Sequence, residues 1–153
     1  MNGRARPASA RAIAQELLAA VLRRHRPLDE VIAGHAGMAR LEPRDRAFAR
    51  KLVGTTLRRL GQIDRLISDC LERPLPGRGA PAMDALRLGA TQLLFLGTPP
   101  HAAVDGSVQL LTAGVAGYRG LVNAVLRRIG REGAERLAAL PPVPINSPGW
   151  LYR

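Results

Sequence analysis

The sequence predicts an all-α protein. Its apolar residues recur at spacings of three and four, and no stretch alternates apolar and polar residues for long enough to form a strand. The length of 153 residues is that of one domain, which can bury a core without disulfide or metal support, and the single cysteine, Cys70, agrees with that. We therefore expect a helical bundle of about seven to eight helices.

The first half of the chain predicts three helices. One follows Ser9, a residue that favours helix starts, and ends at His25 to Pro27. A short helix begins near Leu28, with acidic residues in its first turn, and stops at Gly34 or Gly37. A long amphipathic helix begins at Pro43 and ends at Gly61, which is expected to take the left-handed conformation that closes many helices.

The second half predicts five further helices. Prolines at 74, 81, 99 and 100 separate them, and the second of the five is apolar almost all round, as expected for a central helix. The expected ranges are 62–73, 81–96, 101–113, 118–129 and 131–140.

Composition divides the chain into three parts. Residues 1–8 form a basic, flexible N-terminus, and residues 9–140 form the helical domain. Residues 141–153 contain three prolines in four positions and are expected to be a stiff linker toward another domain. The N-terminal region has neither the unbroken apolar run of a signal peptide nor that of a membrane span, so we expect a cytoplasmic protein without membrane contact.

The charge favours a polyanionic partner. The formal net charge is +11, and because Lys51 is the only lysine, 22 of the 23 basic residues are arginine. Residues 1–60 carry 13 basic and 5 acidic groups (+8), whereas residues 61–153 carry 10 and 7 (+3). Arginine binds phosphate well, although a GC-rich genome also favours it on solvated surfaces. With only 3% aromatic residues, RNA binding would depend on phosphate contacts and on salt.

Catalytic motifs are missing from the sequence. It has no G-x-G-x-x-G turn, no P-loop and no Cys-x-x-Cys pair, and its three histidines lack the spacing of metal ligands. We interpret Asp64 and Asp69 as solvated helix charges and Cys70 as a small buried hydrophobe. Asn123, within an apolar run, is interpreted as an amide satisfied by its neighbours.

A Leu-Arg-Arg triplet occurs three times, at Leu22–Arg24, Leu57–Arg59 and Leu126–Arg128. The last two are each followed by an apolar residue and Gly. We interpret the repeat as helix endings, in which arginine complements the helix dipole and Gly provides the cap.

Three blocks of sequence carry a family resemblance. They are "RDRAFARKLVGTTLRRLGQIDRLI", "ALRLGATQLLFLGTPPHAAVDGSVQL" and "GLVNAVLRRI". In this order and spacing they resemble the NusB-like domain, and more narrowly the N-terminal domain of the RsmB (Fmu/Sun) family of bacterial 16S rRNA cytosine-5 methyltransferases. The tail "INSPGWLYR" resembles the Ser-His-Pro-x-Trp-Leu segment that leads into the catalytic part of that family, but lacks the His before Pro148.

The resemblance implies a fold and a function. The fold is an all-α NusB-like bundle of two packed sub-bundles, and the function is non-catalytic binding of RNA, with 16S rRNA as the expected partner of a methyltransferase domain that follows. S-adenosylmethionine and the catalytic cysteines of the family would belong to that following domain, so no cofactor is expected in this chain. The positions that match the RNA-binding segment of NusB proteins are Arg4, Arg6 and Arg11. On chemistry alone we add Arg44, Arg46 and Arg50.

Two alternatives remain open at the level of sequence. One is a free-standing transcription antitermination factor of the NusB kind, which uses the same fold without an enzyme. The other is a helical protein-interaction scaffold whose charge only reflects genome composition. The sequence leaves the oligomeric state open.

Overall fold

The computed structural model describes residues 9–141, which form eight α-helices and two 3-10 turns and contain no strand. The prediction of an all-α protein is therefore confirmed. The helices are α1 (Ala10–Arg24), α2 (Leu28–Ala33), α3 (Ala36–Arg40), α4 (Pro43–Arg58), α5 (Leu60–Asp69), α6 (Ala80–Leu94), α7 (Pro100–Val108) and α8 (Arg119–Ala138), and the turns are η1 (Gly77–Gly79) and η2 (Ala116–Tyr118).

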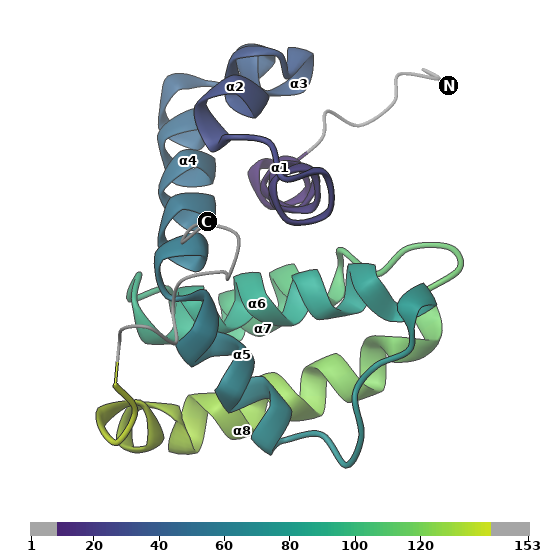
Figure 1. Cartoon of the computed structure of the whole chain (residues 1–153), viewed down its shortest axis with the longest axis vertical. Helices are drawn as coiled ribbons and strands as arrows, with labels where there is room; N and C mark the ends of the chain where they lie inside the picture. The colour runs from purple at the N-terminus through teal and green to yellow at the C-terminus, as the bar shows by residue number, and fades with distance from the viewer. Residues whose placement is uncertain (1–8, 142–153) are drawn as a thin grey trace.

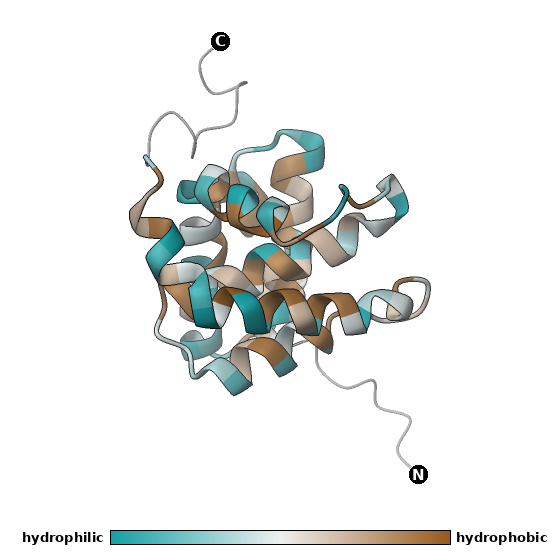
Figure 2. Ribbon diagram, turned by 90° about the horizontal axis from the view of Figure 1, so that it is seen from below, coloured by the Kyte–Doolittle hydropathy of each residue, from teal (hydrophilic) through white to brown (hydrophobic). Residues whose placement is uncertain are grey.

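The helices form two sub-bundles, as Figure 1 shows. The N-terminal sub-bundle consists of α1 to α4, and the C-terminal sub-bundle consists of α5 to α8. Helix α6 joins them, because it packs on α7 and α8 within its own sub-bundle and also on α1 and α4 of the other. The largest fully buried side chains come from both sub-bundles and include Leu17, Leu52, Leu86 and Leu126. Apolar residues gather on the inward sides of the helices and polar residues on the outward sides (Figure 2).

Helix α1 begins and ends as the sequence predicts. The Ser9 hydroxyl accepts a hydrogen bond from the Ala12 amide at 3.1 Å, which caps the first turn. Ile13, Leu17 and Val21 are buried on one face. The helix ends without glycine, because His25 itself takes the left-handed conformation at φ 53° and ψ 38°.

The short helix α3 is an element that sequence analysis missed. Its start is capped by a side chain, since Nδ1 of His35 accepts a hydrogen bond from the Met38 amide at 2.9 Å. Met38 is buried against the N-terminal sub-bundle, so one turn of helix is enough to place an apolar anchor. Histidine is an uncommon cap and so gives no recognisable helix start in the sequence.

The predicted helix end at Gly61 is wrong. Helix α4 stops at Arg58, its C-cap residue Arg59 has φ −111° and ψ 15°, and Gly61 is the second residue of α5. The Arg59 amide still bonds to the Thr55 carbonyl at 3.0 Å, and the next helix begins at once. No left-handed residue is needed, because the chain changes direction through a single residue of ordinary φ.

The predicted break at Gly130 is also wrong, since α8 is one helix of 20 residues. Two glycines in its interior cost about 1 kcal/mol each relative to alanine. Burial offsets that cost: Ile129 is buried, and at Gly133 a β-carbon would lie 2.9 Å from Leu94. The third Leu-Arg-Arg triplet thus lies in the middle of a helix, whereas the other two do close α1 and α4.

The remaining differences concern helix ends. Helix α5 stops at Asp69, well before Pro74, and α7 stops at Val108 instead of residue 113. Both helices close with tight turns, in which the amides of Cys70 and Leu111 bond to carbonyls three residues back. Pro74 therefore lies within the connecting segment and does not end the helix.

Candidate nucleic-acid interface

The N-terminal sub-bundle exposes a group of arginines on α4. Arg44, Arg46 and Arg50, the three chosen from sequence on chemistry alone, are all exposed. Pro43 opens the helix, and the burial of Leu52 on the opposite side turns the basic positions to solvent. All three therefore face solvent, but only Arg46 and Arg50, four residues apart, share one side of α4 and line the same hollow.

These arginines are weakly held within the protein. Arg44 makes no ion pair or hydrogen bond with any residue of 9–141. Arg46 donates to the Leu41 carbonyl at 3.2 Å, and the Arg50 guanidinium lies 4.0 Å from the carboxylate of Asp29, with both side chains well exposed. Exposed pairs of that length contribute little, so the guanidinium groups remain available to a ligand.

Arg11 differs from them, because its side chain joins three helices. Its Nε donates to Oε1 of Gln92 on α6 at 2.8 Å, and its guanidinium carbon lies 5.4 Å from the ring centroid of Phe48 on α4. On α7, a β-carbon added to Gly106 would lie 2.7 Å from the Arg11 side chain, so the helix comes close only because that residue is glycine. Burial lowers the pKa of Arg11 from its usual value. This arginine therefore has a structural role, and its contact with RNA remains a prediction.

Arg4 and Arg6, the other two positions that match the NusB pattern, lie outside the described residues. The same holds for the tail beyond Pro141. Among the described residues, the candidate interface therefore consists of α4 and its neighbours.

A buried ion-pair network was missed by sequence analysis. Asp84 is fully buried on α6 and is paired with Arg23 of α1 and, at 3.1 Å, with Nη1 of Arg87. Arg87 also forms two hydrogen bonds with Asp64, at 2.8 and 3.1 Å. Burial acts to lower the pKa of Arg87, but the two carboxylates outweigh it and raise the pKa above the usual value. The interpretation of Asp64 as a solvated helix charge is wrong, since that carboxylate is held by Arg87.

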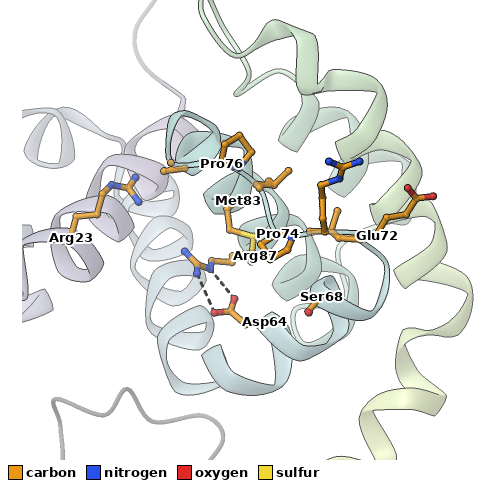
Figure 3. Close-up of a pocket in the computed structure, with 13 residues that line it drawn as sticks. Arg23, Asp64, Ser68, Glu72, Pro74, Pro76, Met83 and Arg87 are labelled. Atoms are coloured by element: carbon orange, nitrogen blue, oxygen red, sulfur yellow. Dashed lines mark hydrogen bonds and ion pairs between the residues drawn. The ribbon is translucent and has the colours of Figure 1, made fainter.

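The hollow beside this network is lined mainly by apolar groups. It measures about 530 Å³ and lies between α5, α6 and the segment 71–77. Figure 3 shows Arg87 and Asp64 facing one another there, with Met83, Pro74 and Pro76 around them. Arg87 and Asp64 already satisfy each other there, whereas Glu72 and Arg73 line the same hollow without an ion pair among residues 9–141.

The other candidates for chemistry keep structural roles. Cys70 is half-buried and free, and burial raises the pKa of its thiol. Asn123 accepts a hydrogen bond from Nε of Arg127 at 3.3 Å on the same helix. Within residues 9–141 no three histidine, cysteine or carboxylate side chains come together as a metal site, and no helix there could span a membrane.

The fold defines a class of helical proteins built from two packed sub-bundles. The chain belongs to the NusB family, whose model matches residues 8–131. Among solved structures it is similar to NusB of T. maritima, with a TM-score of 0.68 over 86% of this chain and 94% of that one, at 24% sequence identity. The fold inferred from the resemblance is thereby confirmed.

Curated relatives refine the family. Ribosomal RNA small subunit methyltransferase B of Xanthomonas campestris pv. campestris is 39% identical over 147 residues, which cover 95% of this chain and 32% of the relative. The protein of the same name from Pseudomonas putida is 33% identical over 147 residues, covering 94% of this chain and 33% of the relative. The chain thus spans about a third of the length of the relatives that it matches.

Proposed function

We propose that this chain is the non-catalytic, RNA-binding domain of an rRNA (cytosine-5) methyltransferase, in which it positions 16S rRNA for the catalytic part. The observation that carries the proposal is the group of exposed arginines on α4, Arg44, Arg46 and Arg50, which the protein itself leaves almost unpaired. Family membership and the names of the relatives support it.

The proposal extends to the organisation of the complete enzyme. Residues 1–8 would add Arg4 and Arg6 to the interface, and residues 141–153 would link the helical domain of residues 9–140 to a catalytic domain. S-adenosylmethionine would bind in that catalytic domain, because the described helices offer no strand edge of the kind that holds a nucleoside cofactor. A cytoplasmic location follows from the same proposal.

Salt-dependent binding tests the proposal. Transcripts that together cover the 16S rRNA are titrated with the chain, and the tightest one is measured over a range of salt concentrations. The logarithm of the affinity should fall with the logarithm of salt by about 0.7 for each phosphate contacted on a single strand. Replacing Arg44, Arg46 and Arg50 by alanine should lower that slope by about 2, which is three such contacts.

The matched control replaces three exposed arginines of the C-terminal sub-bundle, Arg65, Arg127 and Arg131, by alanine. It removes the same charge, so a general effect of net charge would appear equally in both variants. The proposal would be contradicted by binding that does not respond to salt, or by an equal decrease of the salt slope in the two variants. Equal decreases of the salt slope would mean that net charge in general, and not the α4 arginines, governs binding, whereas an unchanged affinity in both variants would favour a scaffold.

A free-standing antitermination factor of the NusB kind remains the second candidate, since the family model alone fits both functions. The parent reading frame distinguishes them. A continuation beyond Arg153 into a strand-rich, glycine-rich sequence supports the methyltransferase, and a stop codon there supports the antitermination factor.

A further inference from the structure

A second basic site lies on the far side of α2 from the α4 arginines. The turn between α1 and α2 borders a hollow of about 520 Å³, whose lining includes Arg23, Arg24 and Arg26 together with Glu16 and His35. Val31 and Gly34 of the α2 segment close one side of it. Ile32, which follows Val31, lines a different hollow together with Arg46 and Arg50. The two basic sites are therefore neighbours separated by one short helix.

The only acidic residue that lines this hollow is already engaged. Oε2 of Glu16 lies 2.6 Å from Nε2 of His35. Because Nδ1 of the same ring accepts the Met38 amide, Nε2 is the nitrogen that carries the proton and donates it to Glu16. The carboxylate thus bonds to the histidine and forms no ion pair with an arginine of the hollow.

The three arginines are held in different ways. Arg23 is anchored by its ion pair with the buried Asp84, while its side chain remains 43% exposed. Arg24 and Arg26 are exposed and form no ion pair or hydrogen bond with any other residue of 9–141. The hollow is therefore lined by one guanidinium that is held in place, that of Arg23, and by two without a partner among residues 9–141, those of Arg24 and Arg26. Its single carboxylate, Glu16, is already bonded to His35.

The backbone at this turn is unusual. His25 has a β-carbon and yet adopts φ 53°, a conformation that costs energy for residues other than glycine. This reversal brings arginines on both sides of it, Arg24 and Arg26, to the same hollow. The helix dipole accounts for arginines in the last turn of α1, but Arg26 lies beyond that turn.

From these observations we propose that the hollow, called here the Arg24–Arg26 pocket, binds a backbone phosphate of RNA. Guanidinium groups bind phosphate oxygens through paired hydrogen bonds, and a group fixed in advance loses less freedom on binding. The inference rests on the proposed function and extends it, because the RNA would then run from the α1–α2 turn across α2 to the arginines of α4.

The test uses the transcript that the chain binds best and compares two double variants. Arg24→Gln with Arg26→Gln should lower the salt slope by about 0.7 to 1.4, which corresponds to one or two phosphate contacts. Arg127→Gln with Arg131→Gln removes the same charge from exposed positions of α8 and should leave the slope within error. Circular dichroism and thermal unfolding establish that both variants are folded.

Each outcome decides a different point. A wild-type slope in the Arg24/Arg26 variant, with the expected loss in the α4 variant, would overturn the pocket and leave the proposed function standing. No salt-dependent binding by the unaltered chain would overturn both. A third measurement compares the melting temperature in inorganic phosphate with that in chloride of equal ionic strength. If phosphate raises the melting temperature, and the Arg24/Arg26 variant loses this effect but keeps the wild-type salt slope of RNA binding, the pocket is a site for a free anion. The proposal that it binds RNA then fails.

Discussion

The two sub-bundles differ in how many of their arginines form ion pairs with carboxylates. In the C-terminal sub-bundle, four of the nine arginines pair with carboxylates of the same sub-bundle: Arg65 with Asp69, Arg87 with Asp64 and Asp84, and Arg128 and Arg136 with Glu132. In the N-terminal sub-bundle, Arg24, Arg26, Arg40 and Arg44 have no such partner among residues 9–141, and Arg50 has only a distant one.

This difference shows that net charge alone does not locate an interface. Paired arginines stabilise or solubilise a surface, whereas unpaired ones retain the ability to replace the counterions of a polyanion. The N-terminal sub-bundle is thus the region in which fewer of the arginines pair with carboxylates of their own sub-bundle.

The largest change in stability is expected at the junction of the two sub-bundles. Replacing Asp84 by Asn leaves Arg23 and Arg87 without their shared carboxylate, and breaking such a buried pair costs about 3 kcal/mol. Urea unfolding measures the loss. The control, Asp69→Asn, removes two partly exposed pairs, with Arg65 and Arg136, and should cost about 0.5 kcal/mol. If both variants lose the same free energy of unfolding, the junction depends on its ion pairs no more than the surface does.

A smaller change in stability is expected at Arg11, and its size shows how much this side chain contributes to the fold. Arg11→Met keeps most of the side-chain volume but removes the hydrogen bond to Gln92, at a cost of about 2 kcal/mol. Arg44→Met, on exposed α4, should change stability by less than about 0.5 kcal/mol.

A double-mutant cycle assigns the Arg11 effect to its partner. Gln92→Leu alone and combined with Arg11→Met should show a coupling of about 1 kcal/mol. Additive losses would indicate that the hydrogen bond contributes nothing and that Arg11 is free to act at the interface instead.

The smallest effect concerns Cys70 and reports on the paired arginines. Burial raises the pKa of its thiol, Arg128 and Arg136 lower it, and Glu132 and Asp69 raise it again. Alkylation by iodoacetamide depends on the thiolate, so its rate should rise with pH through a midpoint above that of free cysteine. Glu132→Gln removes one negative charge and should shift the midpoint to lower pH. A midpoint below that of free cysteine in the unaltered chain would show that the arginines act as unpaired charges.

Sequence predicted the helices well where local forces decide them. Ser9 caps α1 and Pro43 opens α4 as expected, because both act through neighbouring residues. The sequence predicts helix ends at Gly61 and Gly130, yet both lie within helices, because burial of the neighbouring apolar residues outweighs the low helix propensity of glycine.

The candidate site was predictable only in part. Exposure of Arg44, Arg46 and Arg50 follows from the amphipathic pattern of their own helix. The engagement of Arg11 with Gln92, 81 positions away, and the pairing of Asp84 with Arg23, 61 positions away, do not follow from any local pattern. Arg24 and Arg26 were missed as a site because a reversed turn at His25, and not a sequence motif, places them around one hollow.

The end of α8 has a consequence for anything joined to the chain. Gln62 near the start of α5 donates its side-chain amide to the Leu140 carbonyl at 3.3 Å, so the last described turn is tied to the C-terminal sub-bundle. A segment that continues from there has a fixed origin on the domain surface. The effective concentration of an attached group near the α4 arginines is then set by the length and stiffness of the tether, and not by free diffusion.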